Sequence, residues 1–161
     1  MIAGSAGGTN LAPVPKGVRP TADRVRESLF NSLGQFFDGG AVLDLYAGTG
    51  ALGIEALSRG IDRAVFVERD RKVRAVIIKN LRRTRFVDRA EVIGGEVETV
   101  LGRLEGRGEA FDLIFADPPY RIVAAEVGGI SYRLRSLLAP GGRVIVESGE
   151  APVEVAGGKK G

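Results

Sequence analysis

The fold is decided by nine residues that read as a buried strand running into a glycine turn, Val42-Leu43-Asp44-Leu45-Tyr46-Ala47-Gly48-Thr49-Gly50. An apolar run followed by two closely spaced glycines is typical of a strand whose tight turn opens a helix and cradles a ligand. The turn also matches the pattern G-x-G-x-x-G, completed by Gly53, and Glu68 follows Gly48 by 20 residues. A nicotinamide or flavin dinucleotide site is therefore one interpretation of this stretch.

The residues just before the first glycine favour a different ligand. In a dinucleotide site the first glycine follows the strand directly, so that the pyrophosphate reaches the helix N-terminus. Here the carboxylate of Asp44 comes first; it would repel a pyrophosphate but suits the ammonium and sulfonium of S-adenosylmethionine. We expect that cofactor, with its ribose hydroxyls donating to Glu68 and its carboxylate meeting N–H groups of the turn. A turn that only allows close packing of strand and helix is the structural alternative.

The rest of the chain alternates short apolar runs with amphipathic segments. We expect strands at 41–46, 63–68, 90–94, 111–116 and 143–147, and helices at 50–59, 70–82, 96–105 and 131–138. A further helix is expected after Thr21, which can cap it. The alternation predicts an α/β fold with an open, doubly wound and mainly parallel sheet. Residues 1–19 hold several glycines and prolines and are expected to form an extended or hairpin-like N-terminal arm, ahead of one domain at 20–161.

A second stretch, Asp117-Pro118-Pro119-Tyr120, follows the strand expected at 111–116. That strand would deliver Asp117 to the carboxyl edge of the sheet, where open α/β sheets bind ligands. The prolines fix φ and cannot donate hydrogen bonds, so the carbonyls of this bend are acceptors. Asp117 and the Pro118 carbonyl could accept both N–H groups of an exocyclic amine, while Tyr120 stacks on the base. The stretch predicts methyl transfer to a base nitrogen; a β-turn with an incidental tyrosine is the alternative.

The composition restricts the chemistry. The 161 residues include no cysteine and no histidine, which excludes disulfides, thiol nucleophiles, His-based triads and most zinc or iron centres. We therefore expect no metal. The N-terminus lacks the basic start and apolar run of a signal peptide, and no run is long enough to span a bilayer. We expect a cytoplasmic monomer without a membrane partner.

Positive charge is concentrated in one stretch. Between Arg69 and Arg89 there are nine lysines and arginines against Asp70 and Asp88, although the whole chain carries only +3. Such a run suits a polyanion. The apolar positions within it repeat at helical spacing, however, so the favoured interpretation is a helix whose charges face water.

Three segments together resemble a known family, the bacterial 16S ribosomal RNA guanine-N2 methyltransferases of the RsmD type. The segments are Arg19-Pro20-Thr21-Ala22-Asp23-Arg24-Val25-Arg26-Glu27-Ser28-Leu29-Phe30-Asn31, then 42–60 and 117–120. The match covers about residues 2–150, and the first segment is the most diagnostic. The resemblance implies a Rossmann-like class I methyltransferase fold with S-adenosylmethionine as its cofactor.

The resemblance also implies roles for individual residues. Arg19, Pro20 and Thr21 would help to hold the methionine end of the cofactor. Its main binding turn would comprise Asp44, Tyr46, Gly48 and Gly50. Glu68 would hold the ribose, and Gly95-Glu96-Val97 the adenine, where the family usually has Gly-Asp-Ala. Because Glu96 is longer than aspartate, its reach to the adenine amino group differs from that in the family.

Two departures from the family pattern concern the ends of the chain. The arm residues Gly7-Gly8-Thr9-Asn10 are less basic than usual, which weakens the expectation that the arm binds RNA. The family fold continues after its fifth strand into an antiparallel strand pair, which we expect this C-terminally short chain to lack. The fifth strand, with Val144, Ile145 and Val146, would then be an open edge.

The implied function is methyl transfer from S-adenosylmethionine to the exocyclic N2 of a guanine in 16S ribosomal RNA. Asp117, Pro118, Pro119 and Tyr120 would be the catalytic residues, and ribosomal RNA or the assembling small ribosomal subunit the partner. An adenine-N6 DNA methyltransferase would use an Asp-Pro-Pro-Tyr stretch in the same way and stays an alternative. A nucleic-acid-binding module without catalytic activity is the second alternative.

Overall fold

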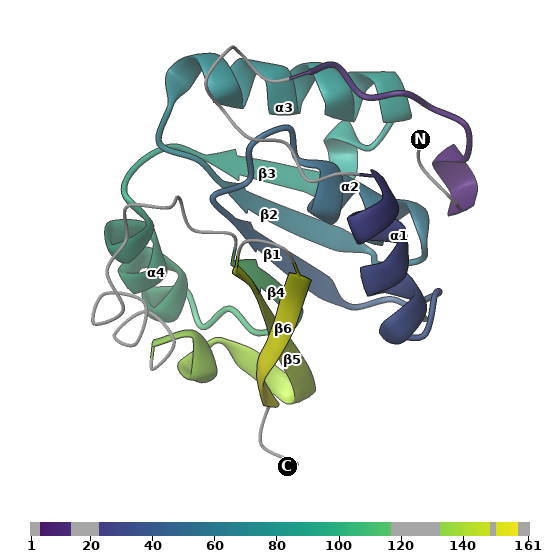
Figure 1. Cartoon of the computed structure of the whole chain (residues 1–161). Helices are drawn as coiled ribbons and strands as arrows, with labels where there is room; N and C mark the ends of the chain where they lie inside the picture. Colours follow the sequence, from purple (N-terminus) through teal and green to yellow (C-terminus); the bar gives the residue numbers. More distant parts are fainter. Residues whose placement is uncertain (1–3, 14–22, 117–132, 149–150, 158–161) are drawn as a thin grey trace.

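The structure is a computed structural model that describes residues 4–13, 23–116, 133–148 and 151–157 of the chain. Within these ranges a single six-stranded sheet has the order β3-β2-β1-β4-β5-β6 (Figure 1). The strands are β1 (Ala41–Leu45), β2 (Arg63–Val67), β3 (Ala90–Ile93), β4 (Phe111–Ala116), β5 (Leu138–Ser148) and β6 (Ala151–Gly157). Strands β1 to β5 pair in parallel and β6 is antiparallel to β5. The predicted parallel α/β sheet is confirmed.

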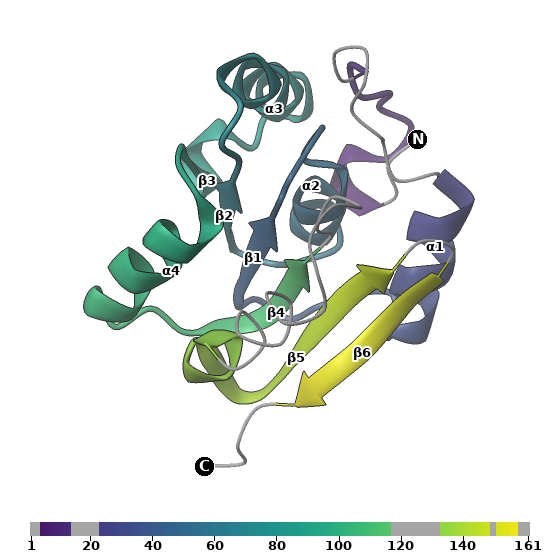
Figure 2. The same cartoon turned by 60° about the vertical axis from the view of Figure 1, so that its left-hand side comes forward.

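Helices cover both faces of this sheet. They are α1 (Asp23–Ser32), α2 (Ala51–Ser58), α3 (Arg71–Thr84) and α4 (Val97–Gly106), with short 3-10 turns η1 (Gly4–Ala6) and η2 (Val87–Arg89). Helices α2 and α3 lie on one side of the sheet and α4 lies on the other (Figure 2). The doubly wound arrangement is as predicted.

The period of two along the strands divides the core into two layers. Val42, Phe66 and Phe115 face α1, α2 and α3, and they pack in one cluster of buried residues. Leu43 and Val65, each one position away, face α4 in a second cluster. Because both faces of β1, β2 and β4 are buried, these strands read in the sequence as continuous apolar runs.

The expectation of an open edge at the fifth strand is wrong. Strand β6 pairs along β5, with Val146 opposite Val153 and Ser148 opposite Ala151. The backbone groups on this side of β5 therefore have a partner strand, which removes the aggregation hazard of an unpaired edge. Strand β6 has only seven residues and contains Pro152, so its periodic signal is too weak for it to be recognised as a strand from its sequence.

Strand β5 also begins earlier than expected. It starts at Leu138 rather than at residue 143, and the helical turn before it covers only 133–136 of the predicted 131–138 within the described residues. Leu138 pairs with Phe111, and the register then shifts before Leu113 pairs with Arg143. The extra residues form an irregular stretch that includes Gly141 at φ 78°, a conformation that glycine adopts without strain.

No helix within the described ranges is both long and apolar enough to cross a membrane.

Candidate functional site

The parallel strands bring their carboxyl ends to one edge of the sheet. The chain leaves β1 at Leu45, β2 at Val67, β3 at Ile93 and β4 at Ala116, all at this edge. Strand β1 has β2 on one side and β4 on the other, so the strand order reverses there. The loops that follow the two neighbouring strands diverge at such a reversal. Open α/β sheets bind ligands in the crevice between these loops. The candidate site is therefore the edge beyond β1.

The glycine turn after β1 has an unusual backbone. Tyr46 has φ 57°, Gly48 has φ 58° and Gly50 has φ 81°. A tyrosine in this left-handed region is uncommon and costs about 1 to 2 kcal/mol. Two hydrogen bonds hold the turn, because the Ala47 N–H donates to the Val67 carbonyl at 3.2 Å and the Gly50 N–H donates to the Ala47 carbonyl at 2.8 Å. Strain retained at such a position is a common mark of a ligand site.

Asp44 supports the turn from within the protein. Its side chain is 2% exposed, and Oδ2 accepts a hydrogen bond from the Gly53 N–H at 3.0 Å. That N–H belongs to the first turn of α2, where backbone donors have no partner in the helix. Asp44 therefore caps α2 and lies beneath the turn. Its predicted contact with a cofactor ammonium stays a prediction.

Glu68 joins the glycine turn to the start of the next helix. Its Oε1 accepts from the Gly48 N–H at 3.3 Å and its Oε2 accepts from the Asp70 N–H at 3.0 Å. Asp70 in turn caps α3 by accepting from the Lys72 and Val73 N–H groups. Each carboxylate oxygen has two acceptor sites. Glu68 is therefore held in place and each oxygen can accept one more hydrogen bond, as two adjacent hydroxyls require.

Arg74 is a residue of this edge that the sequence did not indicate. Its Nη1 donates to the Glu68 carbonyl at 3.0 Å and to the Arg69 carbonyl at 2.7 Å. The guanidinium also lies against Gly94 in the loop after β3, where an added Cβ would come within 2.7 Å of Arg74 Cζ. Arg74 thus fixes two loops of the site. The signal available was the glycine pair 94–95, since a guanidinium packed on a backbone needs a residue without a side chain.

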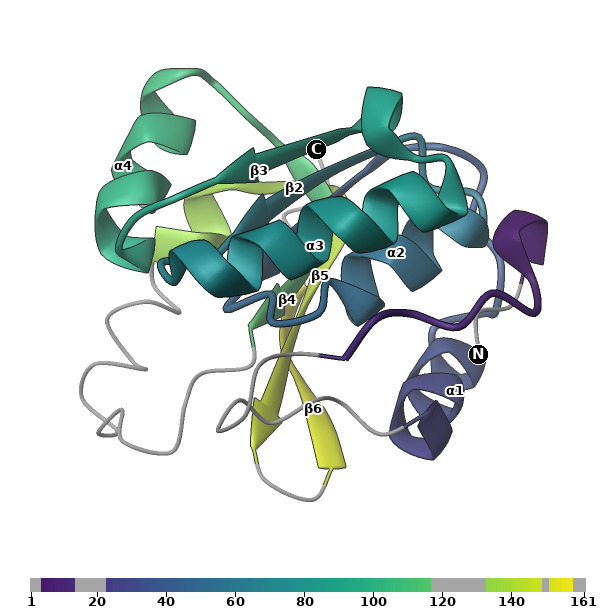
Figure 3. The same cartoon turned by 90° about the horizontal axis from the view of Figure 1, so that it is seen from above.

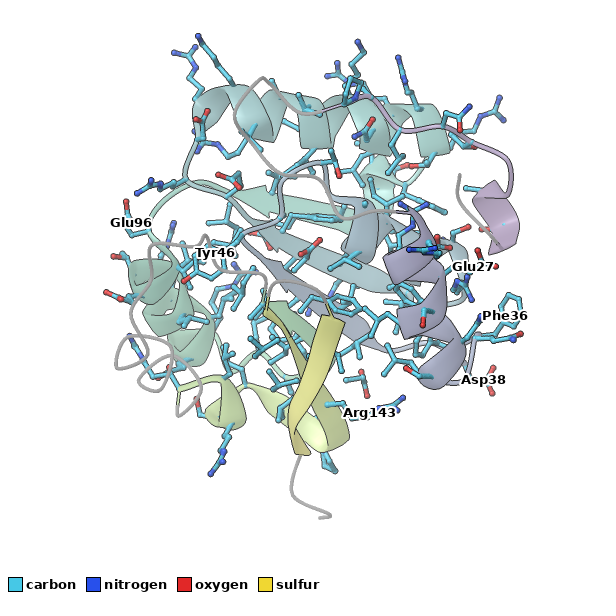
Figure 4. The ribbon with its side chains drawn as sticks, in the orientation of Figure 1. Glu27, Phe36, Asp38, Tyr46, Glu96 and Arg143 are labelled. Atoms are coloured by element: carbon cyan, nitrogen blue, oxygen red, sulfur yellow. The ribbon has the colours of Figure 1, made fainter. Side chains whose placement is uncertain are left out.

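Glu96 lies at the outer side of the same edge. Figure 4 shows Glu96 and Tyr46 on the side of the molecule where β1 and β3 end. The Glu96 side chain is 70% exposed and its Oε1 is 3.7 Å from Arg69 Nη1. It precedes α4 without capping that helix through its side chain. An exposed carboxylate in this place can accept from an amino group.

The remaining predicted site residues lie outside the described residues. These are Arg19, Pro20 and Thr21 before α1, and Asp117, Pro118, Pro119 and Tyr120 directly after β4. The described part of the predicted site therefore consists of Asp44, the glycine turn above it, Glu68 and Glu96.

The surroundings of the glycines test whether a ligand fits. A Cβ added to Gly50 would come within 3.2 Å of Ile77, and one added to Gly53 would collide with Phe66. A Cβ added to Gly48 would meet no atom of the described residues within 4 Å. Among these residues, Gly50 and Gly53 are therefore needed for packing and Gly48 is not. A carboxylate held beside this glycine, as that of Glu68 is, suits the hydroxyls of a nucleoside, which donate hydrogen bonds. Within the described residues no group of acidic side chains could hold a metal ion.

Comparisons with known proteins agree with this geometry. A family model described as "Conserved hypothetical protein 95" matches residues 1–157. The chain is 44% identical over 122 residues to "Putative rRNA methyltransferase YlbH" of Bacillus subtilis (strain 168), and the aligned region covers 75% of this chain and 66% of that protein. It is 42% identical over 123 residues to "Ribosomal RNA small subunit methyltransferase D" of Escherichia coli (strain K12), and the aligned region covers 75% of this chain and 60% of that protein.

The chain thus spans less than two thirds of the length of these curated relatives. A solved structure from Escherichia coli, "Putative methyltransferase yhhF", is 37% identical with a TM-score of 0.73, and the match covers 91% of this chain and 78% of that one. The fold expected from the sequence, a Rossmann-like class I methyltransferase fold, is confirmed by this likeness. The chain belongs to the family described as "Conserved hypothetical protein 95", and its resemblance to RsmD-type enzymes is confirmed.

Proposed function

We propose that the protein transfers a methyl group from S-adenosylmethionine to the exocyclic N2 of a guanine in 16S ribosomal RNA. One observation carries the proposal: Glu68 is held by two backbone N–H groups beside the glycine turn, in a chain whose relatives are named ribosomal RNA methyltransferases. The substrate places the protein in the cytoplasm, with ribosomal RNA or the assembling small subunit as its partner. We expect it to act as a monomer.

The described residues would hold the cofactor along the edge from β1 to β3. Glu68 accepts hydrogen bonds from the ribose hydroxyls, and Glu96 accepts from the adenine amino group. The cofactor carboxylate would meet N–H groups of the turn other than those of Ala47, Gly48 and Gly50, which donate within the protein. Arg19, Pro20, Thr21 and Asp44 are proposed for the methionine end. When bound, the cofactor supplies an electrophilic methyl group on a sulfonium.

The substrate side of the proposal rests on the residues that follow β4. Asp117 and the Pro118 carbonyl accept the two N–H groups of the guanine amine, Pro119 stiffens the bend, and Tyr120 stacks on the base. Asp117 also stabilises the positive charge that develops on nitrogen. A guanine within a helix is out of reach, so the target is unpaired or flipped out of the stack. Holding the reacting atoms in line is the main task of such a site.

The test is transfer of labelled methyl to ribosomal RNA or immature small subunits from cells that lack the gene, followed by digestion to nucleosides. We expect label in N2-methylguanosine. Asp117→Ala should reduce the rate by about 100- to 1000-fold while cofactor binding persists, because it removes one acceptor of developing charge. Asp112→Asn is the matched control. Asp112 lies at the opposite end of β4 and accepts from the Ala41 N–H at 2.9 Å, a bond that asparagine can keep.

Other outcomes would identify the alternatives. Label in N6-methyladenosine of DNA would make the protein an adenine methyltransferase. Binding of RNA without any binding of S-adenosylmethionine would favour a module without catalytic activity. Full activity of Asp117→Ala would show that the proposed substrate contact is wrong.

A further inference from the structure

A buried asparagine connects the glycine turn to the N-terminal arm. Asn80 lies on α3 and its side chain is fully buried. Its Oδ1 accepts from the Ala12 N–H at 2.5 Å, and its Nδ2 donates to the Ala12 carbonyl at 3.2 Å. The same Nδ2 donates to the Thr49 carbonyl at 2.9 Å. Both N–H donors of the amide are thus used, one on the arm and one on the turn.

The contact with Thr49 fixes one peptide plane of the turn. Thr49 lies between Gly48 and Gly50, which both have positive φ. Its carbonyl is held by Asn80, and the N–H of the same peptide, on Gly50, donates to the Ala47 carbonyl. A glycine turn has many accessible conformations. Two hydrogen bonds on one peptide select a single one.

The contact with Ala12 fixes the arm, residues 4–13, against α2 and α3. The Ala6 N–H donates to Ser58 Oγ at 2.8 Å, and Ala12 is only 4% exposed. Ala6 and Leu11 pack against the core cluster beneath α1, α2 and α3. Figure 3 shows the arm passing beside α3, and Arg83 Nη1 donates to the Asn10 carbonyl at 3.4 Å. The arm is therefore a packed part of the domain in the range described.

Undocking of the arm would remove two of the three hydrogen bonds that the Asn80 side chain makes, those with the Ala12 N–H and carbonyl. An unsatisfied buried polar group costs about 1 to 3 kcal/mol. The side chain would have to turn or admit water to recover these bonds. Either change loosens its hold on the Thr49 carbonyl. The docked arm and the ordered turn therefore require the same Asn80 conformation.

We propose that Asn80 is a positioning residue that couples docking of the arm to cofactor binding at the glycine turn. This rests on the proposed role of that turn. Coupling between two binding events is reciprocal. A cofactor that orders the turn must therefore stabilise the docked arm by the same factor by which the docked arm strengthens cofactor binding.

The first measurement uses the unaltered protein and S-adenosylhomocysteine. We expect the ligand to slow hydrogen exchange of the amides in residues 9–12, although these residues lie outside the proposed cofactor contacts. Exchange at these amides that is unchanged by saturating ligand would overturn the coupling. Failure of the unaltered protein to bind S-adenosylhomocysteine would instead reject the cofactor turn, and the coupling with it. The two failures are thus distinguishable.

The second measurement is a double-mutant cycle. Asn80→Ala removes all three side-chain bonds, and Ala12→Pro removes the N–H that donates to Asn80 while leaving α3 unchanged. Each should weaken S-adenosylhomocysteine binding by about 3- to 10-fold, the effect of one hydrogen bond. The double variant should be no weaker than the weaker single variant, because both act through the same contact. Lys79→Ala and Asn10→Ala, both at exposed positions, are the controls on α3 and on the arm.

A merely structural Asn80 gives a different pattern. The melting temperature would then fall in Asn80→Ala while ligand affinity and the ligand effect on amide exchange in residues 9–12 stayed unchanged, and the proposal would be wrong. Fold-changes that multiply in the double variant would overturn it as well. If Asn80→Ala does not fold, Ala12→Pro and the exchange measurement on the unaltered protein still decide the question.

Discussion

At the scale of single residues, the glycines of the turn are required for different physical reasons. Gly50 and Gly53 are required by packing, since a side chain there would meet Ile77 or Phe66. Gly48 has no such neighbour within 4 Å among the described residues, and its φ of 58° is a conformation that favours glycine. We propose that a side chain here would also meet the cofactor. Packing and ligand access can therefore be separated by substitution.

Gly48→Ala should abolish cofactor binding with only a small loss of stability. Alanine at φ 58° costs about 1 kcal/mol, and its methyl group would occupy the space proposed for the ligand. Gly108→Ala is the matched control, because Gly108 has φ 69° and also no neighbour within 4 Å but lies beyond α4. We expect similar losses in the free energy of unfolding and loss of S-adenosylhomocysteine binding, measured by calorimetry, only in Gly48→Ala. Equal affinities in the two variants would move the ligand away from Gly48.

Glu68→Ala should weaken cofactor binding while the fold persists. The proposed bonds to the ribose are charge-assisted and contribute about 1.5 to 3 kcal/mol each, so affinity should fall by about 100-fold or more. Circular dichroism checks that the fold remains. Glu98→Ala removes another carboxylate near this edge, from the exposed first turn of α4, and should leave affinity unchanged. Affinity unaltered in Glu68→Ala would remove Glu68 from the site.

At the scale of elements, a buried ion network joins α1 to α2. Glu55 accepts from Arg26 Nε through Oε1 and from Arg59 Nε through Oε2, both at 3.0 Å. All three side chains are at most 5% exposed. Arg59 also lies over the Phe30 ring, 5.0 Å from its centroid. Arg26 and Phe30 belong to the segment 19–31 that is most diagnostic of the family, so part of this motif holds α1 in place.

Glu55→Gln should destabilise the protein by about 3 to 5 kcal/mol, because two buried guanidinium groups lose their carboxylate. Urea unfolding measures this loss. Glu98→Gln, at an exposed position, should change the free energy of unfolding by less than about 0.5 kcal/mol. A loss below about 1 kcal/mol in Glu55→Gln would mean that packing rather than charge attaches α1.

Helix α3 has one buried face and one basic face. Val73, Ile77 and Leu81 are buried, whereas Arg82, Arg83 and the following Arg85 are exposed. As predicted from helical spacing, the apolar positions explain the helix. That the lysine and arginine side chains of α3 only face water stays a prediction.

We expect replacement of Arg82, Arg83 and Arg85 by glutamine to leave the salt dependence of RNA binding nearly unchanged. Glutamine keeps a donor for the Asn10 carbonyl that Arg83 contacts. The measurement is the slope of log affinity against log salt concentration, whose magnitude decreases by about one unit for each phosphate that the protein no longer neutralises. A slope smaller by two units or more would show that this face binds phosphates.

At the scale of the whole molecule, the strands that local apolar patterns indicate were predictable from the sequence, whereas several side-chain and strand contacts were not. The positions of β1 to β4 follow from apolar runs and were predicted to within one residue at either end. The carboxyl edge follows from the alternation of strands and helices that predicts a parallel sheet, and Glu68 follows from its spacing of 20 residues after Gly48. Asn80 could not be predicted, because an asparagine in a helix is ordinarily exposed and its partners Ala12 and Thr49 lie far away in the sequence. Arg74 was missed because it donates to backbone carbonyls, which any residue carries. The pairing of β6 with β5 was missed because the short β6 segment gives a weak periodic signal.

Deletion of residues 149–161 should convert the protein to an associating form, because β6 protects the edge of β5. Without it, the backbone groups along Val144, Ile145 and Val146 would lose their antiparallel partners. Side chains at these three positions are buried and apolar, so the exposed edge could pair with another copy. Size-exclusion chromatography with light scattering should report oligomers for this deletion. Deletion of 158–161 alone leaves β6 in place and should elute as the unaltered protein does, so oligomers in both deletions, or in neither, would show that β6 is not what protects β5.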